Sequence, residues 1–462
     1  MKKTELSIDD IRLLARRRRN LSAVLVLIVC LLLSSGVNRI KAQEGDVGPA
    51  KEADRINSTE NLTGKDRQEL FEKVWKTIND KYYDPSFNGV DWAAVRERYR
   101  PRAGAVTSDQ EFYLLLSQMA AELHDAHTRF RSPYAYQLSR NHQAVSIGLS
   151  LFEVEGQAAV SSVHPDSEAA QAGVEPGMLV RAIDGVPVAK LLAQAREQVG
   201  VSSSERATKV LTYRQIIAGE DGTALKLELA RADGTSFEVL LKRRLVPDVS
   251  QSTSRLLADG YGYIKFNHFN SPVDKQLADA LEKFKNAPGL ILDLRGNSGG
   301  DVQLVLRIAG YFLPDKVLFR RAYNRLGQTK QDYAGRPGQQ LYAGPLIILV
   351  NESSGSGAEL FSSALQESGR AAVVGSQSCG CALGVTDHRV LKGGGELTVS
   401  EVGYMTAGGR KVEGAGVIPD RPVSVKLADL RERHDAALDE ALNLLHSLKM
   451  RAGSKASQSS SN

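Results

Sequence analysis

The spacing of apolar residues changes along the chain and divides it into stretches with different expected structures. Between residues 65 and 138, apolar side chains recur every three to four positions, which is the period of an amphipathic helix. One such face is formed by Leu70, Phe71, Val74, Trp75 and Ile78. A second helix begins at Ser108, where Glu111 three residues later completes a capping box. We therefore expect residues 65–138 to form a helical N-terminal region.

From residue 139 the period changes to two, which is typical of strands with one buried face. The strand-like runs are 145–152, 158–163, 179–183, 225–229 and 237–242. Residues 167–174 have the pattern of a short helix between these strands. Residues 139–246 therefore predict a small β-rich module.

Beyond residue 247, strands and helices alternate, which predicts an α/β core with parallel strands over residues 247–427. The expected strands are 261–266, 290–294, 346–350 and 371–375, with further strands around 388–405. The expected helices are 273–285, a run after residue 300 that ends near 312, and 357–368. An amphipathic pattern predicts a C-terminal helix at 428–450, and the serine-rich tail, 451–462, is expected to be disordered.

The N-terminus has the pattern of a targeting segment. Basic residues, including Arg16–Arg19, precede a short apolar run that ends in small residues. Residues 1–42 therefore predict a signal peptide, with an uncleaved membrane anchor as the alternative. The polar residues 43–64 predict a flexible linker. We expect the rest of the chain to be exported to the periplasm or cell envelope, and a membrane association through the N-terminal segment stays open.

Charge and cysteine content narrow the function classes. The chain has 59 basic and 54 acidic residues, with no basic stripe interleaved with aromatics, so we expect no nucleic-acid partner. Of its three cysteines, Cys30 lies in the leader, which leaves Cys379 and Cys381. Export permits a disulfide between them, and a reduced pair is the alternative. No cluster of histidines and cysteines has zinc spacing, so neither a metal nor an organic cofactor is implied.

A serine stands where an apolar strand gives way to a helix. Ser356 lies between Gly355 and Gly357, directly after the expected strand and turn. Such a turn exposes a hydroxyl beside free N–H groups and the positive end of a helix, which suits a nucleophile that attacks a carbonyl. The alternative is a capping box with Glu359, and the spacing alone favours the cap.

Three segments resemble one protein family in order and spacing. They are the strand end GLILDLRGNSGG at 289–300, the serine segment 354–370 and the closing segment 412–420. The pattern covers roughly residues 65–427 and resembles the C-terminal processing (tail-specific) serine proteases. The resemblance implies an α/β protein with a crotonase-like catalytic core, in which Ser356 is the nucleophile.

The β-rich module resembles a PDZ domain. Its segment Ser146, Ile147, Gly148 and Leu149 resembles the carboxylate-binding loop of that domain. Residues 167–174 and 176–185 resemble the helix and the strand that follow. The resemblance implies that backbone N–H groups near this loop hold the terminal carboxylate of a peptide that pairs along the strand edge. The alternative is a structural turn in which the glycine only fills a bend.

The chain departs from most members of this family at the general base. The family's usual lysine position is occupied by Cys381, and a thiol is acidic rather than basic. The segment around His127 resembles the histidine segment of the tricorn-type branch, whose glutamate corresponds to Glu413. The resemblance implies that His127 takes the proton of Ser356 while Glu413 orients the imidazole.

Two features of this site stay open. The tricorn branch relays its glutamate through a serine before the histidine, but Ala126 stands there, so Thr128 or a direct contact must serve. The alternative for His127 is a histidine at a helix end that contacts the last carbonyls, and His124 is its local competitor.

The oxyanion hole is expected from backbone donors. These are the N–H of Gly357 and an N–H from Gly299 or Gly300, where glycine permits a close approach. Asp293 and Arg295 at the same strand end are expected to form a structural ion pair.

These features predict an exported serine endopeptidase that cleaves proteins or peptides through an acyl-enzyme. Its PDZ domain would receive the free C-termini of substrates. The alternative is a catalytically inactive family member that binds peptides or another ligand, as the retinoid-binding repeats of the eye share such a core without proteolysis. A binder would have no reason to keep Ser356, His127 and Glu413 together.

Overall fold

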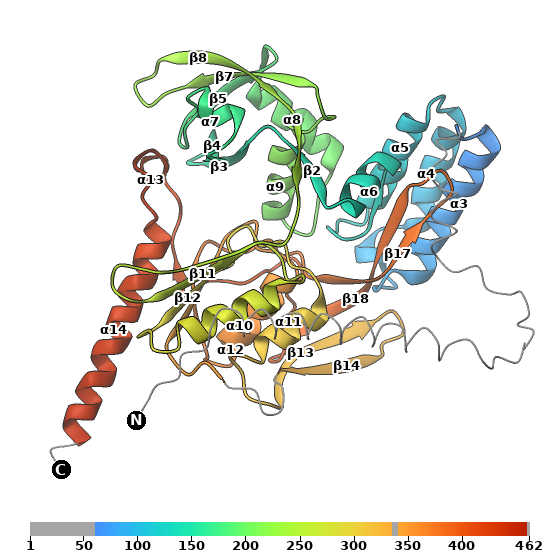
Figure 1. The fold of residues 1–462 in the computed structure, drawn as a ribbon. Coiled ribbons are helices and arrows are strands. Elements are labelled where there is room, and N and C mark those ends of the chain that lie inside the picture. Colours follow the sequence, from blue (N-terminus) through green and yellow to red (C-terminus); the bar gives the residue numbers. More distant parts are fainter. Residues whose placement is uncertain (1–60, 335–340, 460–462) are drawn as a thin grey trace, which may run out of the picture. The chain divides into compact units, whose positions relative to one another are not determined.

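The computed structural model describes residues 61–334 and 341–459, with side chains as far as residue 450 (Figure 1). The predicted leader and the predicted linker as far as residue 60 lie outside the described residues. Leu62 is only 5% exposed, so the last residues of the predicted linker belong to the folded chain. Of the helices in the described ranges, none is long and apolar enough to cross a membrane.

The N-terminal region contains helices, as the apolar spacing predicts. Thr63 caps the first of them, and Ser108 accepts the Glu111 N–H at 3.2 Å at the start of another. The elements are α3 (Gly64–Lys81), η2 (Phe87–Gly89), α4 (Trp92–Ala105), α5 (Asp109–Ala121) and α6 (Pro133–Arg140). The helix α4 was not predicted individually, because arginines and Pro101 interrupt the apolar pattern in its second half, although its buried residues Trp92, Val95, Tyr99 and Ala103 share one face.

The β-rich module is an antiparallel sheet with strand order β3-β4-β5-β7-β8, in which β6 also pairs with β5. Its strands are β3 (Leu149–Val154), β4 (Gln157–Val163), β5 (Leu179–Ile183), β6 (Val186–Pro187), β7 (Ala224–Ala230) and β8 (Ser236–Lys242). Its helices are α7 (Glu168–Gln171), α8 (Val188–Val199) and α9 (Glu205–Gln215). The last two were not predicted, and α9 and the connection that precedes it carry residues that reach the candidate site.

The expected strand at 145–152 is two strands in different sheets. The chain bends at Gly148, which has φ +80°, and β2 (Gln143–Ser146) pairs with β9 (Arg244–Pro247) instead. A Cβ on Gly148 would lie 2.2 Å from the Ser167 Cβ, so only glycine fits this bend.

The core sheet has the order β10-β11-β12-β15-β16-β19, and it is parallel apart from its antiparallel edge strand β10. Its strands are β10 (Ser252–Leu256), β11 (Gly262–Phe266), β12 (Leu290–Asp293), β15 (Leu346–Val350), β16 (Ala372–Gly375) and β19 (Arg421–Pro422). The α/β prediction is therefore confirmed, and the strand at 346–350 has the predicted bounds.

Both faces of this sheet are covered, which explains its continuous apolar strands. The helices of the sheet are α10 (Val273–Lys283), α11 (Val302–Ala309), α12 (Gly357–Glu367) and α14 (Ala436–Ser459) (Figure 1). Ile348 packs in one cluster with residues of α10, α11 and α12. Ile347 and Leu349 point the other way and pack with Ala441 and Leu445 of α14.

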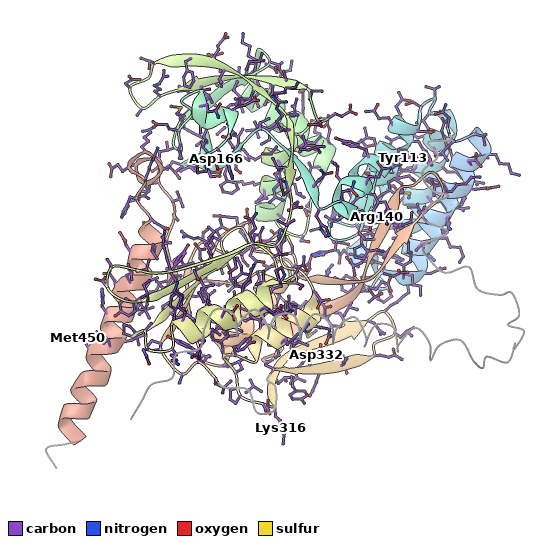
Figure 2. All side chains as sticks on the ribbon, in the orientation of Figure 1. Tyr113, Arg140, Asp166, Lys316, Asp332 and Met450 are labelled. Carbon is purple, nitrogen blue, oxygen red and sulfur yellow. A yellow bond between two sulfur atoms is a disulfide. The ribbon has the colours of Figure 1, made fainter. Side chains whose placement is uncertain are left out.

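A second sheet joins the N-terminal helices to the core. It contains β1 (Arg129–Arg131), β13 (Val317–Asn324), β14 (Thr329–Ala334), β17 (Leu383–Val390) and β18 (Glu396–Thr406). Phe130 of β1 pairs with Leu397 of β18 in an antiparallel register. Tyr113 lies on α5 (Figure 2), and its hydroxyl donates to the Gly393 carbonyl between β17 and β18 at 3.2 Å. The segment that carries His127 lies between α5 and β1, so contacts of both elements hold it against the second sheet.

The C-terminal segment differs from the single helix that the pattern predicts. It forms α13 (Leu427–Glu432) and α14, and the break falls at Arg433, which has φ +54°. The tail that was expected to be disordered is helical as far as Ser459, since it continues α14 through residues such as Ala452 and Ala456 that favour helix.

Candidate active site

Ser356 lies in a tight turn between β15 and α12. Its backbone has φ +52° and ψ −117°, a region that non-glycine residues rarely adopt. The Ser356 N–H lies 2.9 Å from the Cys381 carbonyl oxygen and 3.0 Å from Glu359 Oε2. Glu359 thus caps the helix through its carboxylate, as the capping-box interpretation expects. Strain of this kind at a strand-to-helix turn is found where function requires a fixed side chain.

Glu359 joins the serine turn to the loop 376–382. Its side chain is fully buried, and it accepts hydrogen bonds from the Ser378 hydroxyl at 2.6 Å, from Gly380 N–H at 2.6 Å and from Cys381 N–H at 2.9 Å. Burial raises the pKa of Glu359, and these hydrogen bonds oppose the rise. The sequence indicated only a helix cap here, because the loop's donors lie about twenty residues away.

The loop that holds the family's usual lysine position contains a disulfide. Cys379 and Cys381 are bonded, with 5.3 Å between their Cα atoms, so the alternative of a reduced pair does not hold in this structure. The Cys379 N–H also donates to the Ser354 carbonyl at 2.9 Å. A disulfide sulfur has no titrating proton, so Cys381 cannot serve as a general base.

The glycine-rich strand end packs against the serine turn. Gly299 has φ +95°, and a Cβ there would lie 2.6 Å from both the Ser356 Cβ and the Gly357 nitrogen. The Gly299 N–H is already engaged, since it donates to Asn297 Oδ1 at 2.8 Å. The N–H groups of Gly300 and Gly357 donate to no described residue, and a Cβ on Gly357 would lie 3.4 Å from the Gly300 nitrogen. Asn297 was not among the residues that the sequence indicated. Because it occupies the N–H of Gly299, only Gly300 of the two glycines has an N–H without an acceptor among the described residues.

The segment of His127 is fixed by the carboxylate of Asp125. Asp125 Oδ1 accepts the N–H groups of His127 at 2.7 Å and Thr128 at 2.6 Å, and the Ser400 hydroxyl at 2.9 Å. His127 Nδ1 is buried and has no hydrogen-bond partner among the described residues. Burial lowers the pKa of His127 to about 4, although the charge of Asp125 acts in the opposite direction. His124, the local competitor, is exposed.

Glu413 has one engaged and one unengaged oxygen. Its Oε2 accepts the Ala382 N–H at 2.6 Å, while its buried Oε1 has no partner among the described residues. Burial raises the pKa of Glu413 to about 8, the Ser203 hydroxyl and the Ala382 N–H lower it, and the Asp125 carboxylate raises it. Glu413 is therefore close to both the histidine segment and the cysteine loop.

The structure brings the segments of the three predicted catalytic residues together through shared neighbours. Cys381 accepts from Ser356, and the next residue, Ala382, donates to Glu413. No hydrogen bond joins Ser356 to His127, or His127 to Glu413, within the part of the chain that the structure describes.

Three residues at the start of α9 reach this site, and the sequence analysis missed them. Arg206 donates to the carbonyls of Ser378 at 2.6 Å and Ala415 at 2.9 Å. The Ser204 hydroxyl donates to the Cys379 carbonyl, and the Ser203 hydroxyl accepts the Ala126 N–H at 3.0 Å. The only local signal was a helix cap at Ser204, which says nothing about contacts this far along the chain.

Two further predictions concern neighbouring features. Asp293 and Arg295 form the expected ion pair at 2.7 Å, and Arg295 also binds Asp435 at 2.7 Å. In the segment Ser146–Leu149, the Ser146 hydroxyl accepts the Gly148 N–H at 2.9 Å. Among the described residues, no group of three or more histidine, cysteine or acidic side chains is arranged to hold a metal ion.

Comparison with known proteins finds two matching family models and several similar proteases. Residues 260–423 match the model of peptidase family S41, and residues 63–121 match the tricorn protease C1 domain. A carboxyl-terminal-processing protease of Synechocystis sp. is 28% identical over 404 residues, which cover 84% of this chain and 89% of that protein. The chloroplastic carboxyl-terminal-processing peptidase 2 of Arabidopsis thaliana is 28% identical over 88% of this chain and 76% of its own.

Comparison of the fold with solved structures also finds a C-terminal processing protease. The solved structure of a photosystem II D1 C-terminal processing protease has a TM-score of 0.55 and 24% identity, and the match covers 79% of this chain and 94% of that one. The similarities of sequence and fold extend over the helical region, the β-rich module and the α/β core. Residues 260–423 form a serine peptidase domain of family S41, and the chain as a whole is similar to C-terminal processing and tricorn-related proteases.

Proposed function

We propose that this protein is an exported endopeptidase that cleaves proteins or peptides through an acyl-enzyme on Ser356. The observation that carries the proposal is the turn at Ser356, with φ +52°, beside two backbone N–H groups that have no acceptor among the described residues, those of Gly300 and Gly357. A strained turn of this kind holds a hydroxyl at a fixed place, and free N–H groups next to it can stabilise an oxyanion.

In the proposed reaction, His127 accepts the proton of the Ser356 hydroxyl as the oxygen attacks the substrate carbonyl carbon. The peptide nitrogen then leaves with that proton, and water repeats the sequence to release the acyl group. Burial lowers the pKa of His127 to about 4, so the imidazole is neutral and able to accept a proton at neutral pH. The N–H groups of Gly300 and Gly357 receive the negative charge, because the N–H of Gly299 is already held by Asn297.

The proposed base is histidine rather than lysine. Cys381, at the usual lysine position, is part of a disulfide, and Lys411 is exposed. Glu413 is the proposed partner of His127, since both carry a buried atom without a hydrogen-bond partner among the described residues, Oε1 and Nδ1. Such atoms are costly to leave unpaired, so a bond that forms as substrate binds would account for both.

The proposed substrates present a free C-terminus. We interpret the β-rich module as a PDZ domain and the parallel sheet with its helices as a crotonase-like core. The bend at Gly148 and the order β3-β4-β5-β7-β8 support the first interpretation, and the Ser356 turn supports the second. The basic and apolar composition of residues 1–42 supports export to the periplasm or cell envelope.

Labelling with a fluorophosphonate probe tests the nucleophile without knowledge of the natural substrate. We expect the wild-type protein to be labelled, and Ser356→Ala to lose labelling and peptide cleavage by roughly 10⁴-fold or more. Ser353→Ala is the matched control, since its hydroxyl lies in the same turn and makes no hydrogen bond to a described residue. Labelling that persists in Ser356→Ala would show that the nucleophile is another residue.

Binding of peptides to the inactive Ser356→Ala protein tests the C-terminal specificity. A peptide with a free carboxylate should bind more tightly than the same peptide with an amidated C-terminus, because the amide removes the charge that the PDZ loop would hold. Equal affinity of the two peptides in a calorimetric titration would exclude carboxylate recognition.

A further inference from the structure

Ser203 lies in the connection between α8 and α9, and its position is fixed on both sides. On one side, the Ser202 N–H donates to the Thr208 hydroxyl at 2.9 Å. On the other, the Ser204 hydroxyl accepts the Ala207 N–H at 3.0 Å and caps α9. Arg206 then ties the same segment to the Ser378 carbonyl. The backbone of Ser203 is therefore held in place without help from its own side chain.

Ser203 and its neighbour Ser204 border all three segments that meet near the proposed site. Its Oγ accepts the N–H of Ala126, the residue before His127, at 3.0 Å. Its carbonyl oxygen lies 3.5 Å from the place a Cβ would take on Gly414, the residue after Glu413. The neighbouring Ser204 hydroxyl donates to the Cys379 carbonyl. Ser203 is thus next to the backbone of both the histidine and the glutamate segments.

The Ser203 hydroxyl still has a proton to donate. A serine hydroxyl has one donor proton and two acceptor lone pairs, and the Ala126 N–H occupies one lone pair. Glu413 Oε2 is engaged by Ala382, whereas Oε1 is buried and has no partner among the described residues. Ser203 also lowers the pKa of Glu413, as a hydroxyl close to a carboxylate does.

Given the proposed catalytic roles, we infer that Ser203 is a positioning residue whose hydroxyl accepts from the histidine segment and donates to Glu413. The hydroxyl that the tricorn resemblance places before the histidine is absent here, because Ala126 stands in that position. The structure supplies a hydroxyl from the α8–α9 connection instead, and it binds the backbone of that same alanine. Ser203 acts through Glu413 and the histidine segment and does not touch the reacting atoms.

If Ser203 has this role, it should change how the labelling rate depends on pH, through the ionisation of Glu413. Donation from Ser203 stabilises the ionised carboxylate, so loss of the hydroxyl raises the pKa of Glu413 further above its ordinary value. The other titratable groups that face Glu413 are Asp125, Glu359, Tyr82, Tyr83 and Tyr323, with His127 as its proposed partner. All of these are unchanged in a Ser203 variant, so a shift in the pH profile reports the Ser203 contact.

The test compares Ser203→Ala, Ser203→Thr and Ser202→Ala in the full chain, by the rate of fluorophosphonate labelling from pH 5 to pH 10. Ser203→Ala should label about tenfold to a hundredfold more slowly at pH 7, and its rise in rate should move to higher pH. Ser203→Thr keeps the hydroxyl and should restore both properties. Ser202→Ala removes a buried hydroxyl that has no partner among the described residues, on the same segment, and should behave as the wild type.

The outcomes separate this inference from the proposed function. A Ser203→Ala protein with the wild-type rate and pH profile would overturn the inference alone. A slower rate with an unshifted profile in both Ser203 variants would also overturn it, because it would show a purely structural role. Labelling that survives Ser356→Ala in the same assay would overturn the proposed function and the inference together.

Discussion

The two halves of the candidate site differ in how completely their polar groups are paired. On the nucleophile side, the Glu359 carboxylate accepts four hydrogen bonds, and the Ser356 N–H has two acceptors. On the histidine side, Asp125 Oδ2, His127 Nδ1 and Glu413 Oε1 are buried and make no hydrogen bond of good geometry to a described residue, although the Tyr82 and Ser203 hydroxyls lie close to the Asp125 and Glu413 carboxylates. A buried polar atom without a partner costs about 1–3 kcal/mol, so the second arrangement is the less stable one.

This difference leads us to expect that the serine turn and the proposed oxyanion donors are preorganised, whereas the proposed base and its partner are brought together only when substrate binds. Catalytic hydrogen bonds are often long in a free enzyme and shorten when substrate binds. The nucleophile side is built mainly from backbone groups around one buried carboxylate. The histidine side depends on individual side chains from segments that are distant in the sequence.

The largest effect on stability and activity should follow from removing the Glu359 carboxylate on the nucleophile side. Glu359→Ala would remove the acceptor of four donors, of which Gly380 N–H and Cys381 N–H are backbone groups in the loop. We expect a loss of about 3 kcal/mol or more in the free energy of unfolding and a loss of labelling on the order of a thousandfold. Denaturant unfolding measures the first, with Glu352→Ala in the same turn as the control. A stable and active Glu359→Ala protein would show that the paired half is not preorganised by this carboxylate.

Removing the charge of Glu413 on the histidine side should lower activity and leave the stability of the fold nearly unchanged. Glu413→Gln keeps the shape of the side chain and removes its charge, so we expect kcat/KM to fall about tenfold to a hundredfold. The melting temperature should stay close to that of the wild type, because the amide oxygen of the introduced glutamine would still accept the Ala382 N–H. A full loss of folding in this variant would mean that Glu413 is structural.

The pH dependence of kcat/KM should show the shifted pKa values of both His127 and Glu413. Since burial lowers the pKa of His127 to about 4 and raises that of Glu413 to about 8, kcat/KM should rise twice with pH. The first rise accompanies the loss of the His127 proton, and the second accompanies ionisation of Glu413, which can then balance an imidazolium charge. Glu413→Gln should lose only the upper rise. A single rise near the ordinary histidine pKa of about 6.5 in both proteins would indicate a solvated histidine.

The smallest effect should come from the disulfide. Reduction, or the double change Cys379→Ser with Cys381→Ser, should lower labelling less than about tenfold, because the backbone bonds to Ser354, Glu359 and Glu413 hold the loop independently. Thiol titration confirms reduction, and the labelling rate is then compared. A loss of about a hundredfold would show that the bond itself holds the nucleophile side together.

Structural features that depend on neighbouring residues in the sequence could be predicted. Apolar runs indicated the bounds of β15, and the flanking glycines indicated the turn at Ser356. The glycine pair at 299–300 indicated a close approach, but the choice between the two depends on Asn297 Oδ1, whose position only the fold determines. The cysteine spacing permitted a disulfide and also a reduced pair, and the loop conformation decides for the disulfide.

The contacts of the α8–α9 connection could not be predicted. Ser203 and Arg206 meet partners 77 and more than 170 residues away, and no periodicity links such positions. The helices α8 and α9 were themselves missed, although their buried faces pack against the β-rich module. The roles of His127 and Glu413 rest on the resemblance and on their unpaired atoms, and they stay predictions.

The central claim is that a histidine from one half activates a serine in the other, and the labelling rate of His127→Ala tests it most directly. We predict that the rate constant for fluorophosphonate labelling of Ser356 falls on the order of a thousandfold in His127→Ala at pH 7. In Lys411→Ala, which changes an exposed lysine near the closing segment, the rate should equal that of the wild type. A wild-type rate in His127→Ala, together with a loss in Lys411→Ala, would contradict the account and make lysine the base.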